Sequence, residues 1–79
     1  GEEIEAVVRD VEDVREFIGL KTRRIGKKIW VEVDILIDPD RTIGEGNMIA
    51  ERVKAVLMRK VTDLESIMVH FRPMEAVDK

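Results

Sequence analysis

The sequence contains no cysteine, a single histidine and no long apolar run. Without cysteine the chain has no disulfide and no thiolate-bound zinc cluster, and this absence fits a reducing compartment. No apolar stretch approaches the ~20 residues that a membrane-spanning helix needs, and no signal-peptide pattern is present. The chain begins with Gly1 instead of methionine, so we expect residues 1–79 to be a single domain excised from a longer protein. Its small core needs support from helix–sheet packing, a partner subunit or a bound ion.

Charge of neither sign dominates the chain. Charged residues make up 39% of it and the net charge is -3, which predicts a well-solvated surface and argues against nucleic acid as a partner. One basic cluster stands out, formed by residues 21–24 together with Lys27 and Lys28. It is either the solvated tip of a hairpin or a contact for anionic lipid headgroups.

Apolar spacing in the first half predicts a helix followed by a hairpin. The helix is expected over residues 2–17, with Gly19 allowing the chain to leave it. Residues 20–25 and 29–37 are expected to be strands joined by a turn at Gly26 and Lys27, and the second strand alternates strictly between apolar and other residues. The apolar positions of the helix pattern are Ile4, Val7, Val8, Val11, Val14 and Ile18.

The second half predicts a longer helix and one more strand. Thr42 and Glu45 have the spacing of a capping box, which begins a helix that runs to about Lys60. Gly44 and Gly46 predict a first turn that is either weak or closely packed. Asp63 is expected in a turn, residues 67–72 in a strand that ends at Pro73, and residues 74–79 in a frayed tail. The expected buried positions of this helix are Ile43, Ile49, Val53, Val56 and Leu57.

The order helix, strand, strand, helix, strand predicts an α+β domain. The hairpin strands are antiparallel, whereas a helical crossover makes the second and third strands parallel and adjacent. Two helices then cover one face of a mixed three-stranded sheet. The side chains expected to meet the helices are Ile29, Val31, Val33, Ile35, Ile37, Ile67, Val69 and Phe71.

The opposite face of this sheet is left without a covering layer. Trp30, Leu36 and Met68 are expected there together with Arg72, and they form either a partner surface or scattered surface hydrophobes. Because the core is small, we favour association, and we expect Trp30, Leu36, Met68 and Arg72 to lie in a dimer interface.

His70 is the residue around which a metal site would most naturally form. It shares the uncovered face with Asp34 on the neighbouring strand, and imidazole and carboxylate are suitable ligands for zinc. Glu32 lies two residues from Asp34 and is available to help, whereas the positive charge of Arg72 opposes a divalent cation. His70 is therefore either a metal ligand with Asp34 or an ion-paired surface residue. No nucleophile with a positioned base and no phosphate-binding loop is present, so we expect no enzyme.

Five segments in succession resemble the carboxy-terminal cytoplasmic domain of cation diffusion facilitator transporters. They are residues 20–26, 29–35, 38–39, 42–50 and 67–73. The resemblance implies an αββαβ, ferredoxin-like or metallochaperone-like fold. It also implies a cytoplasmic domain of a cell-membrane transporter that forms a homodimer below the transmembrane domain of the same chain. In this family the domain binds the transported divalent ion, such as zinc, and couples binding to the closeness of the two subunits.

Four positions depart from the family pattern. Asn47 stands where relatives often have histidine, and Arg72 stands where an acidic residue is usual. Ile18 and Gly19 replace a histidine and an aspartate. His70 is retained, so the resemblance implies a regulatory and dimerisation domain with a reduced or altered metal site. The alternative is a free-standing ferredoxin-like module that binds a small molecule or a protein.

Overall fold

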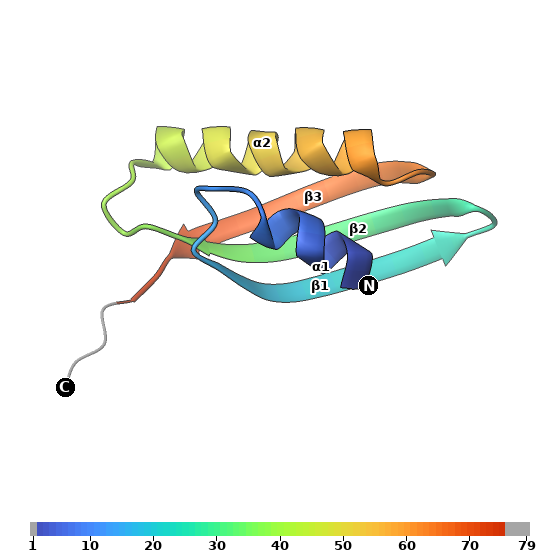
Figure 1. The fold of residues 1–79 in the computed structure, drawn as a ribbon, viewed down its shortest axis with the longest axis horizontal. Helices are drawn as coiled ribbons and strands as arrows, with labels where there is room; N and C mark the ends of the chain where they lie inside the picture. Colours follow the sequence, from blue (N-terminus) through green and yellow to red (C-terminus); the bar gives the residue numbers. More distant parts are fainter. Residues whose placement is uncertain (1, 76–79) are drawn as a thin grey trace.

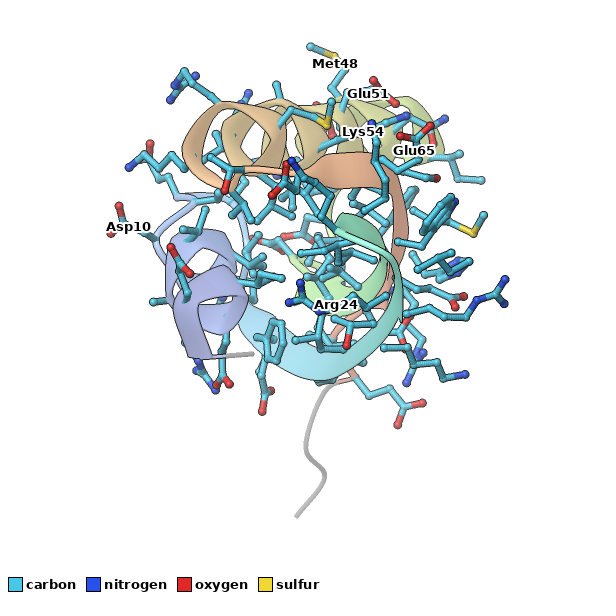
Figure 2. The ribbon with its side chains drawn as sticks, turned by 90° about the vertical axis from the view of Figure 1, so that its right-hand side faces the viewer. Asp10, Arg24, Met48, Glu51, Lys54 and Glu65 are labelled. Carbon is cyan, nitrogen blue, oxygen red and sulfur yellow. The ribbon has the colours of Figure 1, made fainter. Side chains whose placement is uncertain are left out.

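The computed structural model describes residues 2–75 of the chain, which form two helices and a three-stranded sheet. Both helices lie on one face of the sheet, as Figure 1 shows from the side and Figure 2 along the long axis. No helix in this described part is long and apolar enough to cross a membrane. In chain order the elements are α1 (Glu2–Arg9), β1 (Glu16–Ile25), β2 (Lys28–Ile37), α2 (Ile43–Lys60) and β3 (Leu64–Pro73).

β2 is the central strand of the sheet. It pairs with β1 in antiparallel orientation and with β3 in parallel orientation, as the element order predicts. The turn between β1 and β2 uses Gly26 at a φ of 61°, where a residue without a Cβ is least strained. Asp63 also has a positive φ, of 65°, in the expected turn before β3. β3 itself begins at Leu64, three residues before the expected start.

The core lies between the helices and the alternating residues of β2. Val31, Val33, Ile35 and Ile37 are between 0% and 4% exposed, which confirms the predicted buried face. Each such aliphatic side chain contributes roughly 1.5–3 kcal/mol when it is fully buried. The rest of the buried aliphatic core comes from Ile4, Val8, Val11, Ile49, Ala50, Val53, Leu57 and Ile67.

The first helix is shorter than its apolar spacing predicts. It ends at Arg9, and Val11 and Val14 enter the core through turns in which the Val11 amide donates to Val8 O at 3.1 Å and the Val14 amide to Val11 O at 3.0 Å. Phe17 lies in β1, opposite Ile35, so the expected helix over residues 2–17 is wrong beyond Arg9. Phe17 could pack on the core either from a longer helix or from a strand, and in the structure it pairs with β2 as part of a strand.

Gly19 also has a different role from the expected helix exit. It lies inside β1, directly after a register shift between Phe17 and Gly19 that leaves Ile18 as the extra residue. Such a bulge bends the strand and changes which side chains face each side of the sheet. The bulge therefore lets Phe17 face the core while Gly19 lies opposite Asp34.

Asp13 fixes the loop between α1 and β1 to the second helix. Its carboxylate accepts a hydrogen bond from Arg41 Nη2 at 2.9 Å and pairs with Arg52 through its other oxygen. Arg41 precedes α2 and Arg52 lies within it, so one carboxylate connects three segments. This connection holds the irregular residues that replace the expected end of the first helix.

α2 begins with the predicted capping box. The Glu45 amide donates to Thr42 Oγ1 at 3.1 Å, and the Thr42 amide donates to Glu45 Oε1 at 2.9 Å. Gly46 is buried against β3, and a Cβ at this position would lie 2.2 Å from Cε1 of Phe71. The first turn is therefore closely packed at Gly46. Ile43 is 79% exposed, so its expected burial is wrong: it is the first residue of the helix and no described residue covers it.

The end of the sheet is extended by one contact beyond β3. The Met74 amide donates to Ile37 O at 2.9 Å, so the chain stays attached to β2 past Pro73. The remainder of the tail that was expected to fray, residues 76–79, lies outside the described residues.

We predict that Gly46→Ala destabilises the domain by about 1–3 kcal/mol, because the added methyl group overpacks against Phe71. Gly44→Ala is the matched control, since its Cβ would meet only Thr42 Oγ1 at 3.8 Å. The control gains up to about 1 kcal/mol from helix propensity. Urea unfolding measures both variants, and equal stabilities would contradict the close packing of α2 on β3.

Candidate metal centre and subunit-contact face

The sheet face opposite the helices, here called the open sheet face, carries the residues that the sequence predicts for the metal site and for the dimer interface. The register pairs Asp34 with His70 and Leu36 with Arg72, while Trp30 lies opposite Ser66. None of the described helices or loops forms a layer on this side (Figure 2). The residues of β2 and β3 on the open sheet face are Trp30, Glu32, Asp34, Leu36, Ser66, Met68, His70 and Arg72.

His70 contacts Glu32 at the centre of this face. Its Nε2 lies 2.7 Å from Glu32 Oε2, and the two side chains are 48% and 42% exposed. Met68 is the residue directly opposite Glu32, so the contact runs diagonally between the strands. Long side chains reach such diagonal neighbours in a sheet. When the imidazole is protonated, this contact is an ion pair that is partly open to water.

Asp34 lies directly opposite His70 in the register, as the sequence predicts, but its carboxylate lies against β1. Its Oδ2 is 3.2 Å from the position that a Cβ of Gly19 would occupy. The missing side chain of Gly19 therefore makes room for the carboxylate. Sequence reasoning assigned Gly19 to the end of a helix and missed this role. A glycine within a strand pattern is the signal that indicates a bulge or a close approach.

The described residues do not bring three histidine, cysteine, aspartate or glutamate side chains together as a metal-binding group. Zinc normally takes four ligands, with water in some positions at an open site. His70 with Glu32, or with Asp34, is therefore a partial ligand set. Asn47 does not extend it, because it is exposed on α2, in the layer on the other side of the sheet. A single chain therefore provides at most a weak metal-binding site.

The expected contact residues fall into two groups. Trp30 and Met68 line one shallow hollow near the β1–β2 turn together with Lys21 and Arg23 of β1, and Met68 is 54% exposed. Leu36 lies opposite Arg72, six residues along β2 from Trp30, which is a separation of roughly 20 Å in a strand. The ionic residues Glu32 and His70 lie between the groups. The open sheet face thus has a charged centre, with Trp30 and Met68 on one side of it and Leu36, flanked by Glu16 and Arg72, on the other.

Residues 1–74 match a family model described as the cytoplasmic domain of cation efflux proteins. The magnetosome protein MamM of Magnetospirillum gryphiswaldense is 35% identical over 75 residues, which are 95% of this chain and 23% of MamM. The manganese efflux system protein MneP of Bacillus subtilis is 28% identical over 72 residues, which are 91% of this chain and 24% of MneP. The chain thus spans less than a quarter of either relative.

Solved structures of the MamM C-terminal domain have the same architecture. A cadmium form of one variant has a TM-score of 0.89 and 32% identity, and the match covers 94% of this chain and 92% of that one. A single-residue MamM variant has a TM-score of 0.91 and 31% identity, covering 99% and 85% of the two chains. Other MamM variants are nickel and copper forms. These likenesses confirm the predicted α+β fold with two helices on a mixed sheet.

We predict that the contact between Glu32 and His70 contributes little to folding. A double-mutant cycle with Glu32→Ala, His70→Ala and the double variant is expected to give a coupling of about 1 kcal/mol or less, because both side chains are half exposed. Urea unfolding in the presence of a chelator measures it. Lys28 and Glu65, 3.3 Å apart and similarly exposed, form the comparison pair. A coupling several times larger than theirs would show that the contact is a structural element.

Proposed function

Since this chain belongs to the family of cytoplasmic domains of cation efflux proteins, we propose that it is the regulatory and dimerisation domain of a divalent-cation efflux transporter. The parent protein lies in the cell membrane, and this domain is joined in the same chain to the transmembrane part. The observation that carries the proposal is the open sheet face, which no described element covers and on which Trp30 and Met68 lie beside a charged centre. The role is one of binding and contains no catalytic step.

The partner on the open sheet face is a second copy of the chain. A two-fold axis places the same patch of both subunits in contact, so each apolar group is used twice. Trp30 and Met68 then gain a hydrophobic neighbour that a single chain does not supply. Arg72 is exposed and positive, and its role in the dimer is to pair with an acidic residue of the other subunit. Association also supplies stability that a small core lacks.

Metal binding is linked to this dimer because one chain holds only a partial ligand set. His70 and Asp34 from each subunit together approach the four ligands that zinc prefers. For His70 to bind an ion through Nε2, its contact with Glu32 must open or Glu32 must become a ligand itself. Opening an exposed pair costs only about 0–1 kcal/mol, so the contact does not block binding. The ion then favours the arrangement in which the two subunits are close.

The proposed ion is a divalent cation of the zinc type. Manganese in the name of MneP and the cadmium, nickel and copper forms of MamM variants support a divalent cation in general. Zinc is our more specific choice, because imidazole and carboxylate ligands suit it. Arg72, which stands on the same face two residues from His70, lowers the expected affinity.

We predict that the chain is a homodimer and that Met68→Glu weakens dimerisation at least tenfold, because a carboxylate is placed in the contact. Met58→Glu is the matched control: the two methionines are 54% and 53% exposed, and Met58 lies on α2. Sedimentation equilibrium measures both dissociation constants. A wild-type chain that stays monomeric at all concentrations, with and without zinc, would overturn the dimer proposal.

We also predict that zinc binding depends on His70. His70→Ala is expected to weaken zinc binding by at least ~10-fold, as loss of a ligand does, and Asp34→Ala is expected to weaken it as well. Asp10→Ala is the control for charge, since Asp10 lies beside α1, away from the open sheet face (Figure 2). Calorimetric titration with zinc chloride measures all four proteins. Equal affinities of the wild type and His70→Ala would remove His70 from the site.

A further inference from the structure

The turn between β1 and β2 and the strand residues beside it carry a concentrated positive charge. This segment, residues 21–28, is here called the basic hairpin. It contains five of the chain's fourteen basic residues and no acidic residue. Nine basic residues and seventeen acidic residues remain in the rest of the chain, so the rest is strongly negative. The net charge of the basic hairpin is therefore opposite in sign to the net charge of the rest of the chain.

The charges of the basic hairpin are largely without counterions in the described structure. Lys28 is 3.3 Å from Glu65, whereas Lys21, Arg23, Arg24 and Lys27 form no ion pair with any described residue. All eight residues of the basic hairpin are exposed. A packing role does not explain this set of side chains.

An apolar side chain accompanies the charges at the end of the hairpin. Ile25 is 53% exposed and directly precedes the turn at Gly26. Basic residues around an exposed aliphatic side chain are typical of segments that lie in the headgroup region of a bilayer.

The basic hairpin lies at one end of an elongated molecule. The domain measures 47 × 25 × 17 Å, and Figure 1 shows the hairpin at one extreme of the long axis and the end of β3 near the other. Glu16, at the start of β1, and Asp38, after β2, lie near the opposite end of the ladder. Ten strand residues span roughly 33 Å, and the Debye length at physiological ionic strength is about 8 Å. A surface touched by the hairpin is therefore screened from these distant carboxylates. Asp63, whose carbonyl accepts from the Ile29 amide, and Glu65, which pairs with Lys28, lie nearer to it.

The direction of α1 agrees with this orientation. The helix runs antiparallel to β1, so its N-terminal end is the end nearer to the basic hairpin and lies about midway along the domain (Figure 1).

We propose that the basic hairpin docks on the anionic phospholipid headgroups of the membrane, with its basic residues against the phosphates and Ile25 in the interface. This docking rests on the proposed function, which attaches the domain to a membrane protein. A nucleic acid is a poorer match, because the positive charge is concentrated in one turn and the chain as a whole has a net charge of -3.

Vesicle co-sedimentation of the 79-residue chain tests the docking. The wild type is expected to bind vesicles of phosphatidylglycerol and phosphatidylcholine at low salt, to lose binding in 0.5 M salt, and to ignore pure phosphatidylcholine. Equal binding to both vesicle types, or no binding to either, would overturn the proposal. So would tighter binding to a short DNA duplex than to the anionic vesicles.

Two variants with the same net charge locate the contact. Arg23→Gln/Arg24→Gln/Lys27→Gln is expected to lower partitioning at least tenfold, since each basic residue near such a surface contributes roughly fivefold. Arg9→Gln/Arg15→Gln/Lys54→Gln is expected to stay within twofold of the wild type, because the ion pairs that Arg9 and Arg15 form are exposed. Circular dichroism confirms that both variants are folded. Equal losses in the two variants would show that only net charge matters and would overturn the assignment to the hairpin.

A second pair of variants tests the apolar contact. Ile25→Ser is expected to weaken vesicle binding severalfold, whereas Ile43→Ser, at the 79% exposed first residue of α2, leaves it unchanged. Sedimentation equilibrium on the same samples separates the two proposals. A dimer that binds zinc through His70 but ignores anionic vesicles overturns the docking alone, and a monomer that binds them overturns the dimer alone.

Discussion

The fold depends on one strand that is hydrogen-bonded on both edges and covered on only one face. β2 pairs with β1 along one edge and with β3 along the other, so its backbone is fixed through its whole length. Its alternate side chains Val31, Val33, Ile35 and Ile37 are buried under the helices. Because the side chains of a strand alternate, the residues between them must face the other way. The strand that builds the core thereby also builds the open sheet face.

The layer of helices is held on the core side by contacts at several points. The backbone of Gly46 lies against Phe71, which sets the distance between α2 and β3. Asp13 connects the loop after α1 to Arg41 and Arg52. These contacts place both helices on the same face and leave the chain with no third layer in its described part. The association of two copies that we propose would cover the open sheet face.

Much of the architecture could be predicted from the sequence, because each signal has one structural outcome. The alternation in residues 29–37 can only be a strand with one buried face, and Thr42 with Glu45 marks the start of α2. The end of α1 could not be predicted, since Val11 and Val14 reach the core equally well from a helix or from turns. Only the pairing of Phe17 with Ile35, a contact distant in sequence, decides between them.

The site could be predicted as a face but not as a set of contacts. The two-residue period places Glu32, Asp34 and His70 on one side, and the register puts Asp34 opposite His70. The contact that His70 makes is nevertheless with Glu32, because the longer side chain reaches diagonally, while Asp34 lies over the bare backbone of Gly19. Side-chain length and a bulge in the neighbouring strand determine this result. The alternation of apolar and polar residues along the strand reveals neither the reach of the side chains nor the bulge.

We propose that two copies meet on the open sheet face. Isotope-filtered nuclear Overhauser spectroscopy on a mixture of labelled and unlabelled chains tests this contact directly, because only contacts between subunits give a signal. We expect contacts between the Trp30 indole and the Met68 methyl group of different subunits. Intersubunit contacts confined to exposed residues of α2, such as Met48 and Met58, would contradict it.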